Sequence, residues 1–149
     1  MENIKSYGEK NDLNLKTLIA LSRSFQSVRK RELKTIKAGG LTLAQFAVLE
    51  ILYHKGDMRI GDIIEGILAT GGNMTVVIEN LEKDGFITRY PDPKDGRASL
   101  IHITDKGKER MDHIFPTHVE NISDIFEALT REEKDQLIGL LKKLGGNKD

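Results

Sequence analysis

The stretch that most constrains the fold runs from residue 70 to 104, TGGNMTVVIENLEKDGFITRYPDPKDGRASLIHIT. Its first half carries apolar residues at the spacing of one buried helix face: Met74, Val77, Ile78 and Leu81. Gly85 then supplies a residue that can adopt the left-handed conformation and end the helix. Residues 86–90 and 98–103 are rich in β-branched and aromatic side chains, and turn-forming residues separate them. The stretch therefore predicts a short amphipathic helix followed directly by a β-hairpin.

The helix face opposite the apolar stripe differs in composition from an ordinary solvated surface. Its centre is expected to carry Gly72, Val76, Glu79 and Lys83, flanked by Asn73, Thr75 and Asn80. Small, amide and hydroxyl groups suit close approach to another surface, and an outward Val76 suits contact with a thymine methyl group. Because Glu79 and Glu82 would repel phosphate, we interpret them as register or packing elements.

The connection between the two predicted strands, PDPKDGR over residues 91–97, is expected to form a stiff tip. Its two prolines should keep the loop extended and prevent it from pairing as sheet, so that Lys94 and Arg97 project outward. Asp95 lies two residues before Arg97, close enough for its carboxylate to orient the guanidinium. A helix followed by a basic-tipped hairpin is the plan of a winged helix-turn-helix, whose helix enters a major groove beside a wing that reaches phosphates or the minor groove.

The segment over residues 81–107 resembles the wing segment of the MarR family of bacterial transcriptional regulators. The positions that match the family pattern are Leu81, Glu82, Lys83, Gly85, Arg89, Asp95, Arg97, Thr104 and Gly107. The double glycine at 71–72 departs from the family's usual serine-proline-serine turn. The resemblance implies a homodimer that binds a pseudo-palindromic DNA operator, here expected to act as a repressor. It also implies a small-molecule pocket, often for a phenolic ligand, between the dimer helices and the winged domain.

These considerations define candidate site residues. In the recognition helix they are Gly72, Asn73, Thr75, Val76, Asn80 and Lys83. In the wing they are Arg89, Lys94, Asp95 and Arg97. In the implied ligand pocket they are Tyr53, His54, Phe115 and His118, with core packing as the alternative for each. Asparagine can form two hydrogen bonds with adenine, lysine suits phosphate, and an oriented arginine suits a narrow minor groove.

The chain of 149 residues is expected to form one domain, mainly α with a small β-wing, containing about six helices and a two- to three-stranded antiparallel sheet. The winged helix-turn-helix core is expected over about 41–105. Helices over about 12–37 and 106–145 carry more apolar surface than one small winged domain needs, which favours a two-fold dimer built from both chain ends.

Local signals predict where the elements begin and end. Capping boxes are expected at residues 42–45 and 130–133, N-caps at Thr70 and Thr104, and a kink just before Pro116. Residues 57–59 are expected to add a short third strand. The helix over about 60–68 is expected to direct four isoleucines inward: Ile60, Ile63, Ile64 and Ile67.

Composition and the absence of certain motifs argue against several other classes of protein. Acidic and basic residues balance at 23 each, so no overall basic field indicates a polyanion partner, and the basic excess within residues 1–40 is best explained as the solvated face of a long helix. There is no cysteine for a disulfide or thiol switch, and the four histidines lack metal-site spacing, so no cofactor is expected. No membrane-length apolar run, signal peptide or nucleotide-binding glycine loop is present, which predicts a cytoplasmic protein that is not an enzyme. The alternative function is a dimeric protein-interaction module that uses the winged surface without binding DNA.

Overall fold

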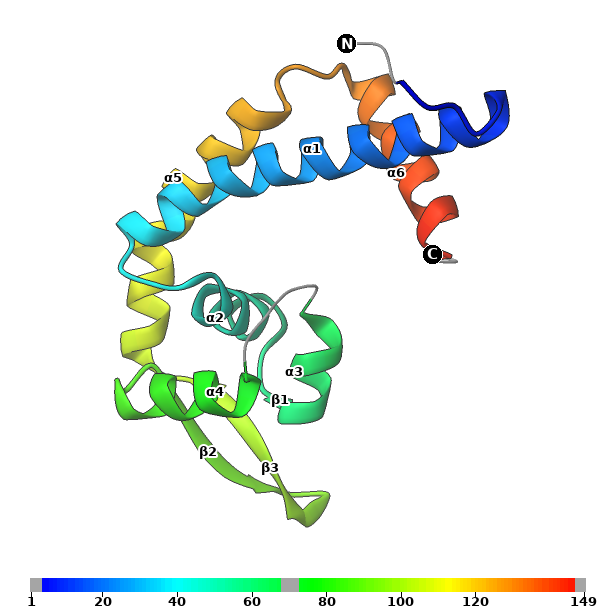
Figure 1. The fold of residues 1–149 in the computed structure, drawn as a ribbon. Helices are drawn as coiled ribbons and strands as arrows, with labels where there is room; N and C mark the ends of the chain where they lie inside the picture. The colour runs from blue at the N-terminus through cyan, green and yellow to red at the C-terminus, as the bar shows by residue number, and fades with distance from the viewer. Residues whose placement is uncertain (1–3, 68–72, 147–149) are drawn as a thin grey trace.

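The computed structural model describes residues 4–67 and 73–146. Within these ranges the chain forms six helices and three strands. They are α1 (Glu9–Ala38), α2 (Leu43–Lys55), β1 (Met58–Arg59), α3 (Ile60–Gly66), α4 (Met74–Lys83), β2 (Ile87–Asp92), β3 (Asp95–Ile103), α5 (Asp105–Phe126) and α6 (Arg131–Gly145). This mainly α fold with a small antiparallel sheet confirms the predicted fold class (Figure 1).

The sheet has the strand order β1-β3-β2, and both pairings are antiparallel. The pairing of Met58 with Ile101 confirms the predicted third strand. The expectation of an unpaired tip over residues 91–97 is wrong, because β2 runs to Asp92, β3 begins at Asp95, and Pro91 lies opposite Ser99. Since β2 is an edge strand, a proline is tolerated there, and the register shifts just after it.

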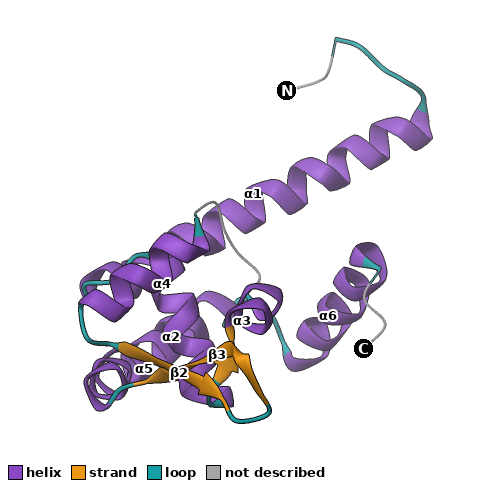
Figure 2. Ribbon diagram, turned by 90° about the horizontal axis from the view of Figure 1, so that it is seen from below, coloured by secondary structure: helices purple, strands orange, loops and turns teal. Residues whose placement is uncertain are grey.

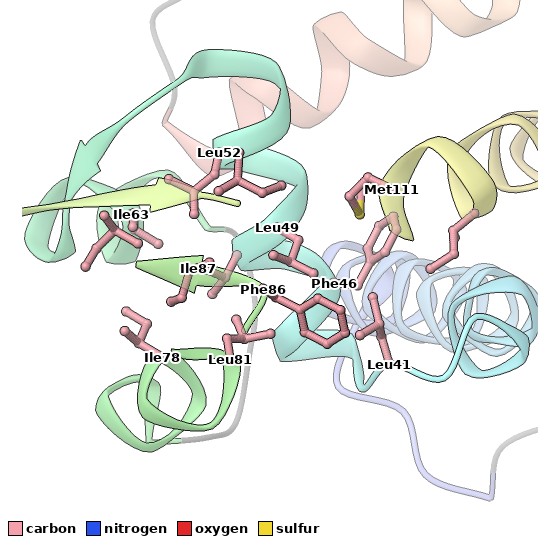
Figure 3. Packing of buried hydrophobic residues seen from close by; sticks show 14 of the residues in the cluster. Leu41, Phe46, Leu49, Leu52, Ile63, Ile78, Leu81, Phe86, Ile87 and Met111 are labelled. Carbon is pink, nitrogen blue, oxygen red and sulfur yellow. The ribbon is translucent and has the colours of Figure 1, made fainter. Parts of the chain in front are cut away.

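The hydrophobic core lies between α2, α3, α4, the sheet and the first half of α5 (Figure 3). Ile78 and Leu81 of α4 are fully buried, which confirms the predicted inner face of this helix. In α3, Ile63 is fully buried, but Ile64 is 48% exposed. The expectation that all four isoleucines face inward is therefore wrong for Ile64, because adjacent residues of a helix lie about 100° apart and this short helix contacts the core on one side only.

Capping side chains mark where several helices begin, and a glycine marks where α4 ends. Both predicted capping boxes are present, at residues 42–45 and 130–133, and Thr104 caps α5. The predicted cap at Thr70 lies outside the described residues, and α4 is instead capped by Asn73. At the other end of α4, Gly85 has a φ of +78°, and the Phe86 N–H donates to the Leu81 carbonyl at 2.9 Å. This Schellman-type ending directs the chain straight from α4 into the hairpin.

The helices at the two chain ends extend away from the winged part (Figures 1 and 2). Helix α1 begins earlier than expected, and the carboxylate of Asp12 accepts hydrogen bonds from the Ser6 hydroxyl and the Tyr7 N–H. Helix α5 continues through Pro116 and changes direction along its length, as Figure 1 shows. Large apolar side chains remain exposed on α1 and α6: Leu13, Leu15, Leu18, Ile19, Leu21, Phe25, Leu137, Ile138, Leu140, Leu141 and Leu144.

Among the described residues, no single helix combines the length and the hydropathy that a membrane span requires. Helices α1 and α2 reach those limits only when they are counted together across a bend of 79°.

Candidate nucleic-acid interface

The outward face of α4 is accessible along its whole length. Ile78 and Leu81 anchor the helix in the core, and the residues that the sequence placed on the opposite side are exposed. They are Asn73, Thr75, Val76, Asn80 and Lys83. Val76 is 46% exposed, although it is a β-branched apolar residue. Gly72, the remaining candidate on this helix, lies outside the described residues.

Asn73 is the N-cap residue of α4, a role that the sequence pattern did not indicate. Its side-chain oxygen accepts a hydrogen bond from the Thr75 N–H at 3.1 Å and thereby caps the N-terminus of α4. The oxygen is therefore already engaged, while the side-chain amide nitrogen remains an available donor. This favours a contact with a base or phosphate acceptor over the two-bond adenine contact.

The β2–β3 hairpin projects beyond α4 (Figure 1). Arg97 lies near the tip of this hairpin, two residues after β3 begins at Asp95. The Asp95 carboxylate accepts hydrogen bonds from the Arg97 backbone N–H at 3.1 Å and from its side-chain Nε at 3.2 Å. The Arg97 side chain is nevertheless 94% exposed. It is thus an oriented but solvent-facing guanidinium, in the arrangement that the two-residue spacing predicted. Lys94 is exposed at the same tip.

Arg89, in strand β2, forms an ion pair with α4. Its Nε donates to the Glu82 carboxylate at 3.1 Å, which joins β2 to α4. This contact gives Glu82 the packing role that the sequence suggested. It also means that Arg89 would have to share its guanidinium between Glu82 and a phosphate.

A second ion pair, which the sequence did not reveal, links the wing tip to the residue just before α3. The Arg59 guanidinium donates to Asp92 Oδ2 at 2.8 Å through Nε and at 2.5 Å through Nη2. The Lys94 backbone N–H donates to Asp92 Oδ1 at 2.9 Å. The Asp92 side chain is only 8% exposed. Because Arg59 is also the N-cap residue of α3, this pair fixes the tip relative to the helix-turn-helix.

The hydrogen bond from the Lys94 N–H and the Arg59 guanidinium together lower the pKa of Asp92 from its ordinary value of 3.8. A carboxylate with a lowered pKa in the folded state stabilises the fold above its unfolded-state pKa, and this contribution disappears as the pH falls through the folded-state pKa. We expect Asp92→Asn to lower the melting temperature at pH 7, and the difference from wild type to shrink as the pH falls below about 4. Melting curves by circular dichroism check this, and a difference that does not change with pH would contradict it.

A third contact fixes the base of the wing. Asp57, in the turn before β1, accepts a hydrogen bond from the Tyr90 hydroxyl at 2.5 Å and lies 2.7 Å from His102 Nδ1. Burial raises the pKa of Asp57, but the hydrogen bonds to these two residues outweigh it, so the pKa is lowered overall. Because Tyr90 lies on β2 and His102 on β3, one carboxylate joins both wing strands to the loop that follows α2.

The four candidate pocket residues come together in one cluster of rings. His54 lies 4.7 Å from Phe115, and Tyr53 lies 6.3 Å from Phe115, between ring centroids. His118 is 5.8 Å from Phe115, is buried, and is 3.0 Å from the Thr35 hydroxyl through Nδ1. The cluster thus connects α1, α2 and α5.

This cluster borders a cavity of about 440 Å³ between α1, α2 and the end of α3. Of the four candidates, His54 lines the cavity directly. Four charged lining residues were missed from the sequence: Arg29, Glu32, Glu50 and Lys55. Arg29 and Glu32 form an ion pair at 3.0 Å, and burial raises the pKa of Glu50. No local sequence pattern identifies these lining residues, because the cavity forms only where separate helices meet.

The Thr-x-x-Gly pattern at the start of α5 has a packing reason. Thr104 accepts a hydrogen bond from the Gly107 N–H at 3.1 Å and donates one to the Gly85 carbonyl at 2.6 Å. A Cβ atom at Gly107 would lie 2.4 Å from the Phe86 carbonyl oxygen. Glycine therefore lets α5 pack directly against the junction of recognition helix and wing.

Known proteins share both the sequence and this architecture. The model of the MarR family matches residues 41–99. The HTH-type transcriptional regulator YkoM of Bacillus subtilis is 44% identical over 124 residues, covering 83% of this chain and 80% of that protein. The HTH-type transcriptional regulator MhqR of the same organism is 37% identical over 134 residues, covering 90% and 92%. The structure of BpsR from Bordetella bronchiseptica superimposes with a TM-score of 0.74 at 25% identity, covering 87% of this chain and 98% of that one.

The matched family segment contains the recognition helix and most of the wing, and the relatives extend over nearly the whole chain. The chain therefore belongs to the MarR family of transcriptional regulators.

Proposed function

We propose that this MarR-family regulator is a homodimeric, sequence-specific DNA-binding repressor that acts in the cytoplasm. The observation that carries the proposal is the exposed outer face of α4 beside a wing tip whose Arg97 is oriented by Asp95. An α-helix fits the major groove of B-DNA, and a fixed arginine fits the adjacent minor groove or its phosphates. Lys83 at the end of α4 and Lys94 at the wing tip are exposed and supply further positive charge.

The exposed apolar surface of the terminal helices supports a dimer. No residue of α6 is buried within the chain, and five of its leucine and isoleucine side chains are exposed. Two-fold pairing through α1 and α6 would cover this surface. Such a dimer would present two α4 helices to half-sites about 34 Å apart on one face of the duplex.

A small, phenolic effector is proposed to release the protein from DNA. The supporting features are the cavity beside the aromatic cluster and its position between the long helices and the winged part. In BpsR, DNA binding is regulated by 6-hydroxynicotinic acid. A ligand that prefers one spacing of the two winged parts would shift the population away from the DNA-binding state.

The proposal is tested with a duplex that the wild-type protein selects from a random-sequence library. In a mobility-shift titration, Arg97→Ala is expected to weaken binding to this duplex about 10- to 100-fold. The melting temperature should not fall, because the side chain is almost fully exposed. Wild-type binding should also weaken steeply as salt increases, because phosphate contacts release counterions.

A matched control is Arg23→Ala, which removes an exposed arginine from α1, away from the wing. It should leave the affinity unchanged. Equal affinities of wild type and Arg97→Ala would exclude the assigned role of the wing. If no duplex is selected and no salt-dependent shift occurs, the winged surface is better explained as a protein-interaction module.

A further inference from the structure

One acidic residue occupies the centre of the outer face of α4. Glu79 is exposed and lies one turn after Val76 and one turn before Lys83. Within residues 4–67 and 73–146 its side chain forms neither a hydrogen bond nor an ion pair. Glu82, the other acid on the outer part of the helix, is paired with Arg89. The two glutamates therefore differ in what they can do at a DNA surface.

A free carboxylate that approaches DNA is repelled by the phosphates, and a hydrogen bond that it accepts from a base can offset this repulsion. Only two donors are exposed at base edges in the major groove, the amino group of cytosine and the amino group of adenine. Adenine also presents the acceptor N7 beside its amino group, and this acceptor would repel the second carboxylate oxygen. Cytosine has no such acceptor at its major-groove edge. A central, unpaired glutamate on a recognition helix thus suits cytosine.

We propose that Glu79 is a specificity-determining residue that selects cytosine at one position of each half-site. The inference rests on the proposed DNA-binding function and adds to it the base that the helix centre recognises. Val76 lies about 4.5 Å before Glu79 along the helix axis, and base pairs are spaced about 3.4 Å apart. A thymine contacted by the Val76 side chain would therefore lie one or two base pairs from this cytosine.

The test is a selection from a random-sequence duplex library with full-length wild type, Glu79→Gln and Glu79→Ala, each sequenced after binding. Wild type should enrich one cytosine per half-site, and replacing that base pair should weaken binding roughly 5- to 150-fold. Glu79→Gln should enrich adenine at the same position, because glutamine pairs with the adenine amino group and N7. Glu79→Ala should lose the preference there and bind non-specific DNA more tightly, since a repulsive charge has been removed.

Glu82→Gln is the matched control on the same helix. It also removes one negative charge, but its partner is Arg89, so it should change affinity and leave the selected sequence unchanged. All four proteins should melt at similar temperatures, because both glutamates are exposed. If Glu79→Gln selects the same sequence as wild type, the inference is overturned while DNA binding stands. If wild type selects no sequence, the proposed function and the inference are both overturned.

Discussion

The double substitution Leu140→Lys, Leu144→Lys in α6 is expected to lower the affinity for a two-half-site operator by a factor of about 100 to 10,000. Both leucines are 66% exposed in the single chain, one turn apart. In the proposed dimer they are covered by the partner, and burying an unpaired ammonium group there is strongly unfavourable. A monomer engages one half-site at a time and loses the gain in effective concentration that links the two recognition helices.

Size-exclusion chromatography with light scattering measures the oligomeric state, and a mobility-shift titration measures operator binding. Asp135→Lys is the control, because it introduces a lysine at an exposed position on the other side of α6. The control should remain dimeric and retain full affinity. Wild type that is already monomeric, or a double variant that stays dimeric with unchanged affinity, would contradict the assignment of α6 to the dimer interface.

Replacing Ile63 by alanine is expected to lower the free energy of unfolding by about 2–5 kcal/mol. Ile63 is fully buried on α3 within the core that also contains Ile78 of α4 (Figure 3). Truncation removes buried methyl and methylene groups and leaves a cavity in the core between α3 and α4. We therefore expect operator binding to fall together with stability.

The neighbouring Ile64 offers a control of identical chemistry. Because its side chain is 48% exposed, Ile64→Ala should change the free energy of unfolding by less than about 1 kcal/mol. Denaturant unfolding of both variants at one fixed protein concentration keeps the contribution of dimer dissociation equal in the comparison. Similar losses for both would show that α3 packs differently from the arrangement described above.

Features that depend on neighbouring residues could be predicted from the sequence. The inner face of α4, both capping boxes, the left-handed Gly85 and the approach of Asp95 to Arg97 each involve residues at most a few positions apart. Local spacing determines which groups can meet within one helix turn or one hairpin tip. A short third strand was also expected over residues 57–59, and Met58 and Arg59 pair with β3.

Features that depend on chain segments meeting in space could not be predicted in the same way. The Arg59–Asp92 pair joins residues 33 positions apart, and its partners are known only once β1 and the wing share a sheet. The burial of Ile63 and not Ile64 depends on the angle at which α3 meets the core.

The sequence by itself determined an amphipathic helix, a basic-tipped hairpin after it and apolar terminal helices, because periodicity and turn chemistry act over short stretches of chain. The tertiary structure alone decided how the wing is braced and which ring systems border the cavity. It also decided that, in the part of the chain that the structure describes, Glu82 pairs with Arg89 while Glu79 has no ionic partner. The physical reason is that ion pairs and ring contacts between elements require positions that only the packed core defines.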